Sequence, residues 1–318
     1  MLDECLKTKC LISVIIPAYK AESCLVELCH RLKASLEKIS TSYEIIMVED
    51  CGGDNSWNII QKLACQDSRI KGIQFSRNFG QHYAITAGLD HCSGEWVVIM
   101  DCDLQDQPEE ILRLYMKAQE GYDVVLADRG KRNDSIVKKI ISRVFYKIFN
   151  YFSGLAHNGQ VGNFRIISKN VVRHYCLMRE QLRFFGGLVT WMGFPTAIVE
   201  VKHASRFDGK SSYTFRKLRK LAIETIIAYS DKPLRLSIRF GFLVTAFAAF
   251  FGIYILLRAL FYGSPITGWS SLIVSIYFIG GVIIATLGIL GIYLGKVFEE
   301  IKRRPLYIIK ESTKHWCA

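Results

Sequence analysis

Two motifs that identify common nucleotide-binding enzymes are missing from this sequence. It has no GxGxxG pattern and no P-loop, so neither a dinucleotide-dependent oxidoreductase nor a P-loop NTPase is expected. Its ten cysteines show no CxxC spacing and are scattered through apolar runs, which indicates no disulfide framework. The N-terminus has no signal peptide, and we therefore expect a cytosol-facing protein with reduced thiols.

Hydrophobic residues are abundant and unevenly distributed. They make up 50% of the 318 residues, which excludes intrinsic disorder and allows one large or two modest domains. Neither Phe240–Leu257 nor Ala259–Gly295 contains a charged residue. Because a membrane span takes about 20 apolar residues, we predict two transmembrane helices, at about 238–260 and 271–295. Two buried helices of a soluble core are the alternative, but such long uncharged runs are rare in soluble cores.

Basic residues flank the two apolar segments. Lys and Arg total 41 against 29 Asp and Glu, so the formal net charge is +12. Such an excess suggests nucleic acid, an anionic membrane surface or phosphate-bearing ligands as partners. The basic residues gather at 216–239 and 296–310, beside the predicted spans, where anionic lipid headgroups explain them better than nucleic acid does. The loop between the spans has only Arg258 at its edge, so the positive-inside rule places both termini in the cytoplasm.

The first 130 residues alternate between apolar runs and helical patterns. The predicted strands cover residues 11–16, 44–48, 70–75, 96–100 and 123–127. The predicted helices between them cover about 22–38, 55–65, 80–91 and 109–119. This repeated β-α-β order predicts an α/β fold, a mostly parallel sheet with helices on both faces. Ligands of such sheets bind beyond the carboxyl ends of the strands.

A basic amphipathic pattern follows at residues 135–152. A helix with this pattern can lie in the membrane interface, or it can pack on a core with its basic side in solvent. The two predicted spans favour the interfacial helix.

Two carboxylates follow the predicted strand at 96–100. Asp101 and Asp103 are one residue apart where the chain turns, and Gln105 comes next. Carboxylate and amide oxygens are ligands that Mg²⁺ and Mn²⁺ take, and these ions keep positions for substrate phosphates. The segment therefore predicts a divalent metal site formed by Asp101, Asp103 and Gln105. A polar turn that caps the next helix is the alternative, since Asp106 stands just before Pro108.

The turn after the predicted strand at 44–48 has features of a ligand-binding loop. Asp50 could accept a hydrogen bond from a nucleotide base or a ribose hydroxyl. Gly52 and Gly53 permit close approach of the backbone to a ligand. Taken alone, the segment is also an ordinary βα turn.

The order of motifs along the chain resembles one enzyme family. In sequence, the motifs are SVIIPAYKAE, VEDCGGDNS, FSRNFGQHYAITAGLD, IMDCDLQDQPEE, ADRGKRNDS, VGNFRIISK and RFDGKSSY, followed by two spans and LGKVFEEIKRRPLYII. They resemble the polyprenyl-phosphate glycosyltransferases, inverting family-2 enzymes of the dolichyl-phosphate mannosyltransferase and bactoprenol glucosyltransferase type. The resemblance covers nearly the whole chain, and the SRNFG form and the tail are typical of the bacterial branch. It implies a Rossmann-like GT-A fold followed by two transmembrane helices.

The resemblance also implies a role for each matching residue. The residues implied to bind the nucleotide sugar are Pro17, Tyr19, Val48, Asp50, Asp101 and Cys102. Asp101, Asp103 and Gln105 would hold Mg²⁺ or Mn²⁺ beside the diphosphate.

Arginines are implied to contact the phosphate groups, because their rigid fork matches phosphate oxygens. Arg129 would face these groups, with Arg132 and Ser135 nearby. Arg206, with Lys210 and Ser211 in its GKSSY loop, would close over the donor or acceptor phosphate. Asp103, Arg129 and Arg206 are therefore the expected catalytic residues.

Three segments depart from the family pattern. Where the family commonly has Asn-Glu, this chain has Lys20-Ala21, so a carboxylate contact is lost or moved to Glu22. Asn163 stands where the family often has an acidic residue, which puts a general base there in doubt. Ser212 stands at the lysine of the family's GxSKY segment. A general base is not required, because a phosphate acceptor with a second pKa near 6 is largely ionised at neutral pH.

The resemblance implies a specific reaction. A hexose, best matched by glucose, would pass from a nucleotide sugar, best matched by a UDP-sugar, to undecaprenyl or another polyprenyl phosphate. The site would face the cytoplasm at the bacterial inner membrane, and the assembly would be a homo-tetramer. UDP-galactose, an N-acetylhexosamine donor and GDP-mannose stay open.

Two other functions are weighed against this reaction. A processive polysaccharide synthase normally has a QxxRW-type signature and more spans, and the sequence has neither. A catalytically degenerate membrane scaffold is disfavoured because Asp101, Asp103, Arg129 and Arg206 are all present.

The expected organisation has four parts. A cytoplasmic GT-A catalytic domain covers 1–212, and juxtamembrane amphipathic helices cover 213–237. The two transmembrane helices and a short external loop cover 238–295, and a cytoplasmic basic tail covers 296–318.

Overall fold

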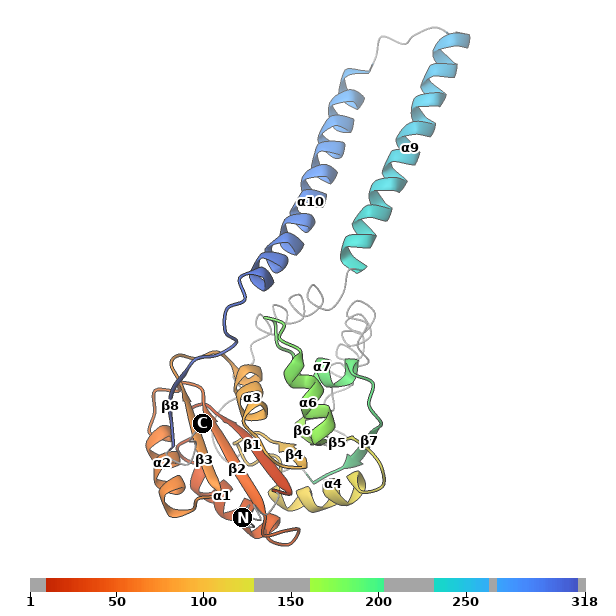
Figure 1. The fold of residues 1–318 in the computed structure, drawn as a ribbon. Coiled ribbons are helices and arrows are strands. Elements are labelled where there is room, and N and C mark those ends of the chain that lie inside the picture. Colours follow the sequence, from red (N-terminus) through yellow and green to blue (C-terminus); the bar gives the residue numbers. More distant parts are fainter. Residues whose placement is uncertain (1–9, 129–160, 203–231, 263–267, 314–318) are drawn as a thin grey trace, which may run out of the picture. The chain divides into compact units, whose positions relative to one another are not determined.

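The computed structural model describes residues 10–128, 161–202, 232–262 and 268–313. These residues belong to two compact units, one built on a β-sheet and one that contains two long helices (Figure 1). The sheet unit includes residues 304–313, although the long helices precede them in the sequence.

Among the described residues, the sheet has eight strands in the order β7-β5-β6-β4-β1-β2-β3-β8. The strands are β1 (Ile12–Ala18), β2 (Tyr43–Glu49), β3 (Ile70–Phe75), β4 (Trp96–Ile99), β5 (Val124–Asp128), β6 (Val161–Ser168), β7 (Thr196–Glu200) and β8 (Ile309–Ser312). Strands β1 to β4 run parallel, as do β5 and β7, whereas β6 and β8 run antiparallel to their neighbours. The expected fold class, a mostly parallel α/β sheet followed by two long apolar helices, is confirmed.

The central strands have the composition that a doubly covered sheet requires. All seven residues of β1 (ISVIIPA) and all seven of β2 (YEIIMVE) are buried. Strands buried on both faces are continuous apolar runs rich in β-branched residues, and such runs are visible in the sequence. The five strands predicted from those runs are confirmed as β1 to β5.

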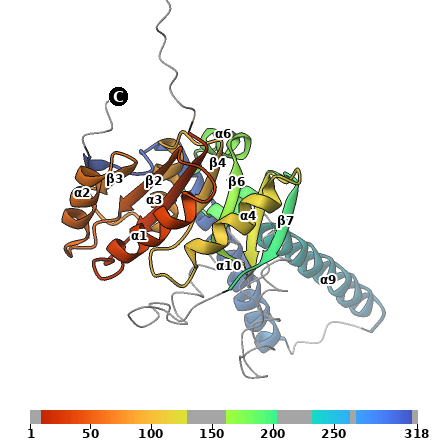
Figure 2. The same cartoon turned by 90° about the horizontal axis from the view of Figure 1, so that it is seen from below.

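Helices cover both faces of the sheet (Figures 1 and 2). The hydrophobic cluster on one face includes residues of α1 (Leu25–Leu36), α2 (Ser56–Gln66) and α4 (Ile111–Ala118), with the short helix η1 (Pro108–Glu110) before α4. On the other face lies α3 (Gln81–Asp90), against which α6 (Lys169–Leu177) and α7 (Phe185–Trp191) pack. Helix α3 lies so close to β1 that a Cβ on Gly88 would be 2.3 Å from Ile15 Cγ2, so only glycine fits there.

The segment 304–313, which we call the C-terminal strap, adds an edge strand to the sheet. Strand β8 pairs antiparallel with β3. Glu311 Oε2 accepts a hydrogen bond from Trp57 Nε1 at 3.0 Å, and Thr313 exchanges two hydrogen bonds of 3.0 Å with Gly72. The segment is therefore more than the basic tail expected at 296–318. Its strand was not predicted because IKES has no apolar run and is defined only by its long-range partner.

The second unit contains α9 (Lys232–Tyr262) and α10 (Trp269–Ile301). By length and composition, Leu234–Tyr254 of α9 and Ser275–Ile301 of α10 can each cross a membrane. Neither apolar window is buried within the described part of the chain, unlike the core helix of a soluble protein. Both helices begin before the predicted spans and end after them.

Candidate functional site

Three loops follow the carboxyl ends of the neighbouring strands β1, β2 and β4. Each contains a non-glycine residue in the left-handed region: Lys20 and Cys51 both have φ of 53°, and Leu104 has φ of 58°. This conformation costs about 1–2 kcal/mol for a residue with a side chain. Such strain is concentrated at functional sites. The carboxyl edge of β1, β2 and β4 is therefore the candidate site.

The predicted metal ligands lie in the loop after β4. Asp101 and Asp103 are half-buried. Asp101 Oδ1 accepts hydrogen bonds from Gln81 Nε2 at 2.7 Å and from Asn163 Nδ2 at 3.5 Å. Asp103 Oδ1 accepts from the Gln105 backbone N–H at 3.2 Å, which stabilises the turn. The structure thus brings Asp101 next to two amides from distant segments.

The donor chemistry of this loop fits a divalent cation. Asp101, Asp103 and Gln105 offer only oxygen ligands, which Mg²⁺ and Mn²⁺ prefer. The described residues contain no group of three or more His, Cys, Asp or Glu side chains that could hold a metal. Asp101 and Asp103, with Gln105, would hold such a cation, and phosphate oxygens of a substrate would complete the coordination, as is usual for Mg²⁺.

Cys102, between the two aspartates, is a neutral thiol. A hydrogen bond with the Cys24 thiol, together with burial, holds the pKa of Cys102 well above its ordinary value. Its expected contact with the nucleotide sugar stays a prediction.

Asp50 is buried and fixes the loop before α3. Only 3% of its surface is exposed. Its two carboxylate oxygens accept the backbone N–H groups of Phe79 at 2.7 Å and Gly80 at 2.9 Å. Burial raises the pKa of Asp50, and these two hydrogen bonds oppose the shift only in part. The structure therefore shows Asp50 as an anchor for the SRNFG segment, and its contact with a nucleotide stays a prediction.

The other predicted nucleotide contacts differ in exposure. Pro17 and Val48 are buried and lie opposite each other in β1 and β2. Tyr19, just after β1, is 50% exposed, and Lys20 Nζ lies 5.6 Å from the centre of its ring. Tyr19 therefore presents an aromatic face that a planar base can contact, whereas the side chain of Val48 is packed in the core beneath α3.

Glu22 binds the loop after β1 to the loop after β2. Its Oε2 accepts from the Asn55 backbone N–H at 3.0 Å, and its own N–H donates to Asp54 Oδ2 at 3.2 Å. A parallel bond joins Ala21 N–H to Ser56 Oγ at 3.0 Å. The family's carboxylate contact at position 21 was expected to be lost or moved to Glu22, and the structure shows Glu22 holding the two loops together.

A buried cation beside Asp101 was not predicted from the sequence. Arg165, in β6, donates to the carbonyls of Asn163 at 3.2 Å and Gly162 at 2.8 Å, and its guanidinium lies 4.9 Å from the Phe185 ring centre. Burial lowers the pKa of Arg165 to about 10, against the opposing charge of Asp101, so it stays protonated at neutral pH. A lone Arg inside the apolar run FRII was the signal that could have identified it.

His82, the second residue of α3, is neutral. Burial lowers its pKa to about 4, and the charges of Arg165 and Arg183 contribute to the shift. His82 therefore adds no charge beside Arg165 and Arg183 at neutral pH.

Several predicted residues lie outside the described residues. They are Arg129, Arg132, Ser135, Arg206, Lys210, Ser211 and the amphipathic segment 135–152. Their roles stay predictions.

Comparisons with known proteins agree on one family. The model of a family described as "Glycosyl transferase family 2" matches residues 13–176. The chain is 37% identical to glycosyltransferase YkcC of Bacillus subtilis over 94% of this chain and 93% of that protein. It is also 37% identical to the SfII prophage-derived bactoprenol glucosyl transferase of Shigella flexneri, over 95% of this chain and 98% of that protein.

Solved structures with a similar sheet include glucosyl-3-phosphoglycerate synthase of Mycobacterium tuberculosis, in complex with Mn²⁺, UDP and glucosyl-3-phosphoglycerate. It is 15% identical, covers 70% of this chain and 79% of its own, and has a TM-score of 0.47.

Proposed function

The chain belongs to glycosyl transferase family 2, and from this membership we propose that it moves a hexose from a nucleotide sugar to undecaprenyl or another polyprenyl phosphate. The observation that carries the proposal is the 37% identity to a bactoprenol glucosyl transferase over 95% of the chain. UDP-glucose is the donor of first choice, because several relatives are named glucosyl transferases.

The carboxyl edge of the sheet is the proposed donor site. Asp101 and Asp103, with Gln105, would hold Mg²⁺ or Mn²⁺, which neutralises charge on the departing nucleoside diphosphate when bound. The exposed ring of Tyr19 would contact the base. The further residues proposed to contact the nucleotide sugar are Pro17, Val48, Asp50 and Cys102.

The acceptor supplies its own nucleophile. A lipid phosphate is largely ionised at neutral pH, so its oxygen can attack the anomeric carbon without a general base. Asn163, a neutral amide that contacts Asp101, is compatible with this chemistry. A single displacement breaks the bond to the diphosphate as the new bond to the lipid phosphate forms, and it inverts the anomeric centre. Arg129 and Arg206, with Arg132, Ser135, Lys210 and Ser211, would hold the phosphate groups in line.

The membrane is the proposed location of the acceptor. Two helices are long and apolar enough to cross it, and basic residues flank them on the sides predicted to be cytoplasmic. We therefore place the catalytic domain (1–212), the juxtamembrane segment (213–237) and the residues after 295 on the cytoplasmic side of an inner membrane. A reporter after Ala318 would then be cytoplasmic and one near Gly268 external. The homo-tetramer stays a prediction.

Product analysis tests the function. Purified protein is incubated with undecaprenyl phosphate, a divalent cation and a panel of nucleotide sugars, and the lipid product is weighed by mass spectrometry. We expect a single hexose added to the lipid phosphate with UDP-glucose as donor. A ladder of added sugars would identify a processive synthase instead, and no product with any donor would favour a scaffold.

A further inference from the structure

Asp101 is held by a neutral partner from another element. Gln81 Nε2 donates a hydrogen bond of 2.7 Å to Asp101 Oδ1. Asn163 reaches the same oxygen from β6 at 3.5 Å. A carboxylate that is bonded through one oxygen from two directions has its plane fixed. Partners of this kind orient metal-binding carboxylates and tune their affinity.

The backbone of Gln81 is itself held firmly. Gln81 is the first residue of α3, and the two residues before it donate their N–H groups to the buried Asp50. Gly80, with φ of 108°, turns the chain into the helix in a conformation that a residue with a side chain rarely adopts. The start of α3 therefore has little freedom to shift relative to the strand ends.

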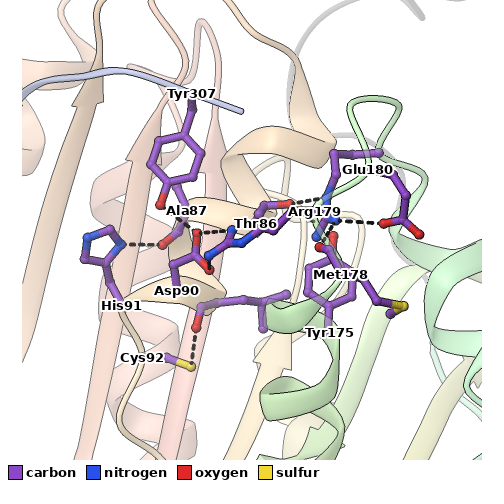
Figure 3. Close-up of polar contacts among 12 residues, drawn as sticks. Thr86, Ala87, Asp90, His91, Cys92, Tyr175, Met178, Arg179, Glu180 and Tyr307 are labelled. Atoms are coloured by element: carbon purple, nitrogen blue, oxygen red, sulfur yellow. Dashed lines mark hydrogen bonds and ion pairs between the residues drawn. The ribbon is translucent and has the colours of Figure 1, made fainter. Parts of the chain in front are cut away.

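The far end of α3 is fixed by a second network (Figure 3). Asp90 accepts two hydrogen bonds of 2.9 Å from Arg179 and one of 2.7 Å from the Tyr307 hydroxyl of the C-terminal strap. In the middle of the helix, Thr86 contacts Tyr175 at 3.0 Å, and Gly88 packs directly on β1. A helix held at both ends and along its length presents its first side chain in one place.

The chemical type of Gln81 matters as much as its place. A lysine or arginine at this position would orient Asp101 but also neutralise it, which weakens binding of a cation. An amide donates the same hydrogen bond and leaves the full negative charge. Arg165 already supplies one buried positive charge nearby, so a second would oppose the cation further.

We propose that Gln81 is a positioning residue, which orients Asp101 for a divalent cation through a neutral hydrogen bond. The proposal rests on the proposed function, in which Asp101 binds that cation. No contact of Gln81 with substrate is implied.

Manganese binding tests the role directly. Mn²⁺ affinity is measured on the full-length protein in detergent by electron paramagnetic resonance. Gln81→Met keeps the length of the side chain and removes the donor, and we expect it to weaken Mn²⁺ binding about 10- to 100-fold. Gln81→Lys restores a donor but adds charge, and we expect a loss at least as large. Raised Mn²⁺ should return the turnover of Gln81→Met to near the wild-type value, because only the metal affinity is affected.

The controls separate positioning from folding and from the proposed function. Gln66→Met, at an exposed site on α2, should bind Mn²⁺ like wild type and melt at the same temperature. If Gln81→Met has a lower melting temperature than wild type, Gln81→Asn is used for the same comparison, because its amide is too short to reach Asp101. If both variants are unfolded, the proposal is overturned.

Two outcomes at Asp101 distinguish the failures. If Asp101→Asn loses Mn²⁺ and Gln81→Met binds it like wild type, the positioning role is wrong and the donor site stands. If Asp101→Asn binds Mn²⁺ as well as wild type, the cation site itself is wrong, and the positioning role is overturned with it.

Discussion

Buried carboxylates lie both at the amino edge of the sheet, where its parallel strands begin, and at the carboxyl edge, where they end, but the hydrogen-bond partners of these carboxylates differ. At the amino edge, Glu44 Oε2 pairs with Lys71 Nζ at 2.7 Å, and Oε1 accepts from Ser13 Oγ at 2.6 Å and from Ser93. At the carboxyl edge, Asp50 is bonded by two backbone N–H groups and Asp101 by two amides. Burial raises the pKa of Glu44, but its hydrogen bonds with Lys71, Ser13 and Ser93 outweigh it and the pKa is lowered. The pKa of Asp50 is raised instead.

The comparison separates a carboxylate that is neutralised within the fold from carboxylates that we propose to act on a ligand. Glu44 is neutralised inside the protein, so its charge serves the fold. The hydrogen-bond donors shown at Asp50 and Asp101 are backbone and side-chain amides, which leave the negative charge of the carboxylates in place. Burying a carboxylate costs stability, and such costs are tolerated where a ligand completes the site.

Removing charge at the carboxyl edge should have the largest effect on activity. We expect Asp101→Asn and Asp103→Asn each to lower turnover on the order of 1,000-fold, or about 4 kcal/mol at the transition state, because the cation loses a charged ligand. Their melting temperatures should stay near that of wild type. Wild-type turnover of either variant in the lipid-transfer assay would show that the carboxylates of the carboxyl edge are no more important for activity than Glu44 at the amino edge.

Removing charge at the amino edge should affect stability alone. Lys71→Met leaves Glu44 buried without its cation, and we expect a loss of about 3 kcal/mol of unfolding free energy. That corresponds to a melting temperature lower by about 6–12 °C for a unit of this size. Turnover per folded molecule, measured at a temperature where the variant is folded, should equal that of wild type. A specific loss of turnover would show that the amino edge contributes to the chemistry.

The two edges should also differ in the sign of their pH dependence. The folded pKa of Glu44 is lowered, so the stability it contributes is full above its unfolded pKa of about 4.3 and is lost as the pH falls through the folded value. The folded pKa of Asp50 is raised, so its contribution is full below about 3.9 and is lost as the pH rises. Thermal melts of wild type, Glu44→Gln and Asp50→Asn are measured from pH 3 to 7, and the difference in unfolding free energy between each variant and wild type is plotted against pH. We expect slopes of opposite sign for the two variants. Slopes of equal sign would contradict the directions of the two pKa shifts.

The smallest effect is expected at the C-terminal strap. Asp90 resembles Glu44 because a cation, Arg179, neutralises it, and the Tyr307 hydroxyl donates a further hydrogen bond to it. Tyr307→Phe removes one hydrogen bond but keeps the ring stacked on Phe75, 5.3 Å between centres. We expect a loss of about 1 kcal/mol in unfolding free energy. The matched control is Tyr122→Phe, at a half-buried position elsewhere in the sheet unit. An equal loss of unfolding free energy in both variants would show that the hydrogen bond from Tyr307 to Asp90 has no special role.

The central strands could be predicted because their burial is encoded locally. In β1 and β2, a continuous apolar run is enough to identify a strand covered on both faces. Strands β6 and β8 could not be predicted in the same way. Arg165 and Asn163 interrupt the run in β6, and β8 has polar residues that become a strand only by pairing with β3. Pairing between segments more than 200 residues apart leaves no periodic signal.

The candidate site was predictable only in part for the same reason. Asp101 and Asp103 stand together in the sequence, so their pattern was visible. Gln81 lies 20 positions from Asp101, and its contact arises from the way α3 packs against the strand ends. The contact of Asp50 with a ligand stays a prediction, and the structure adds its hydrogen bonds with the loop before α3, which no spacing in the sequence indicates.

Transfer in the absence of divalent cations is the most direct test of the account. Protein stripped with EDTA is given UDP-glucose and undecaprenyl phosphate, and glycosylated lipid is measured before and after Mg²⁺ or Mn²⁺ is restored. We expect no product until the cation returns, and full recovery afterwards, because the role proposed for Asp101 and Asp103 is to bind it. Full turnover in EDTA would contradict the account.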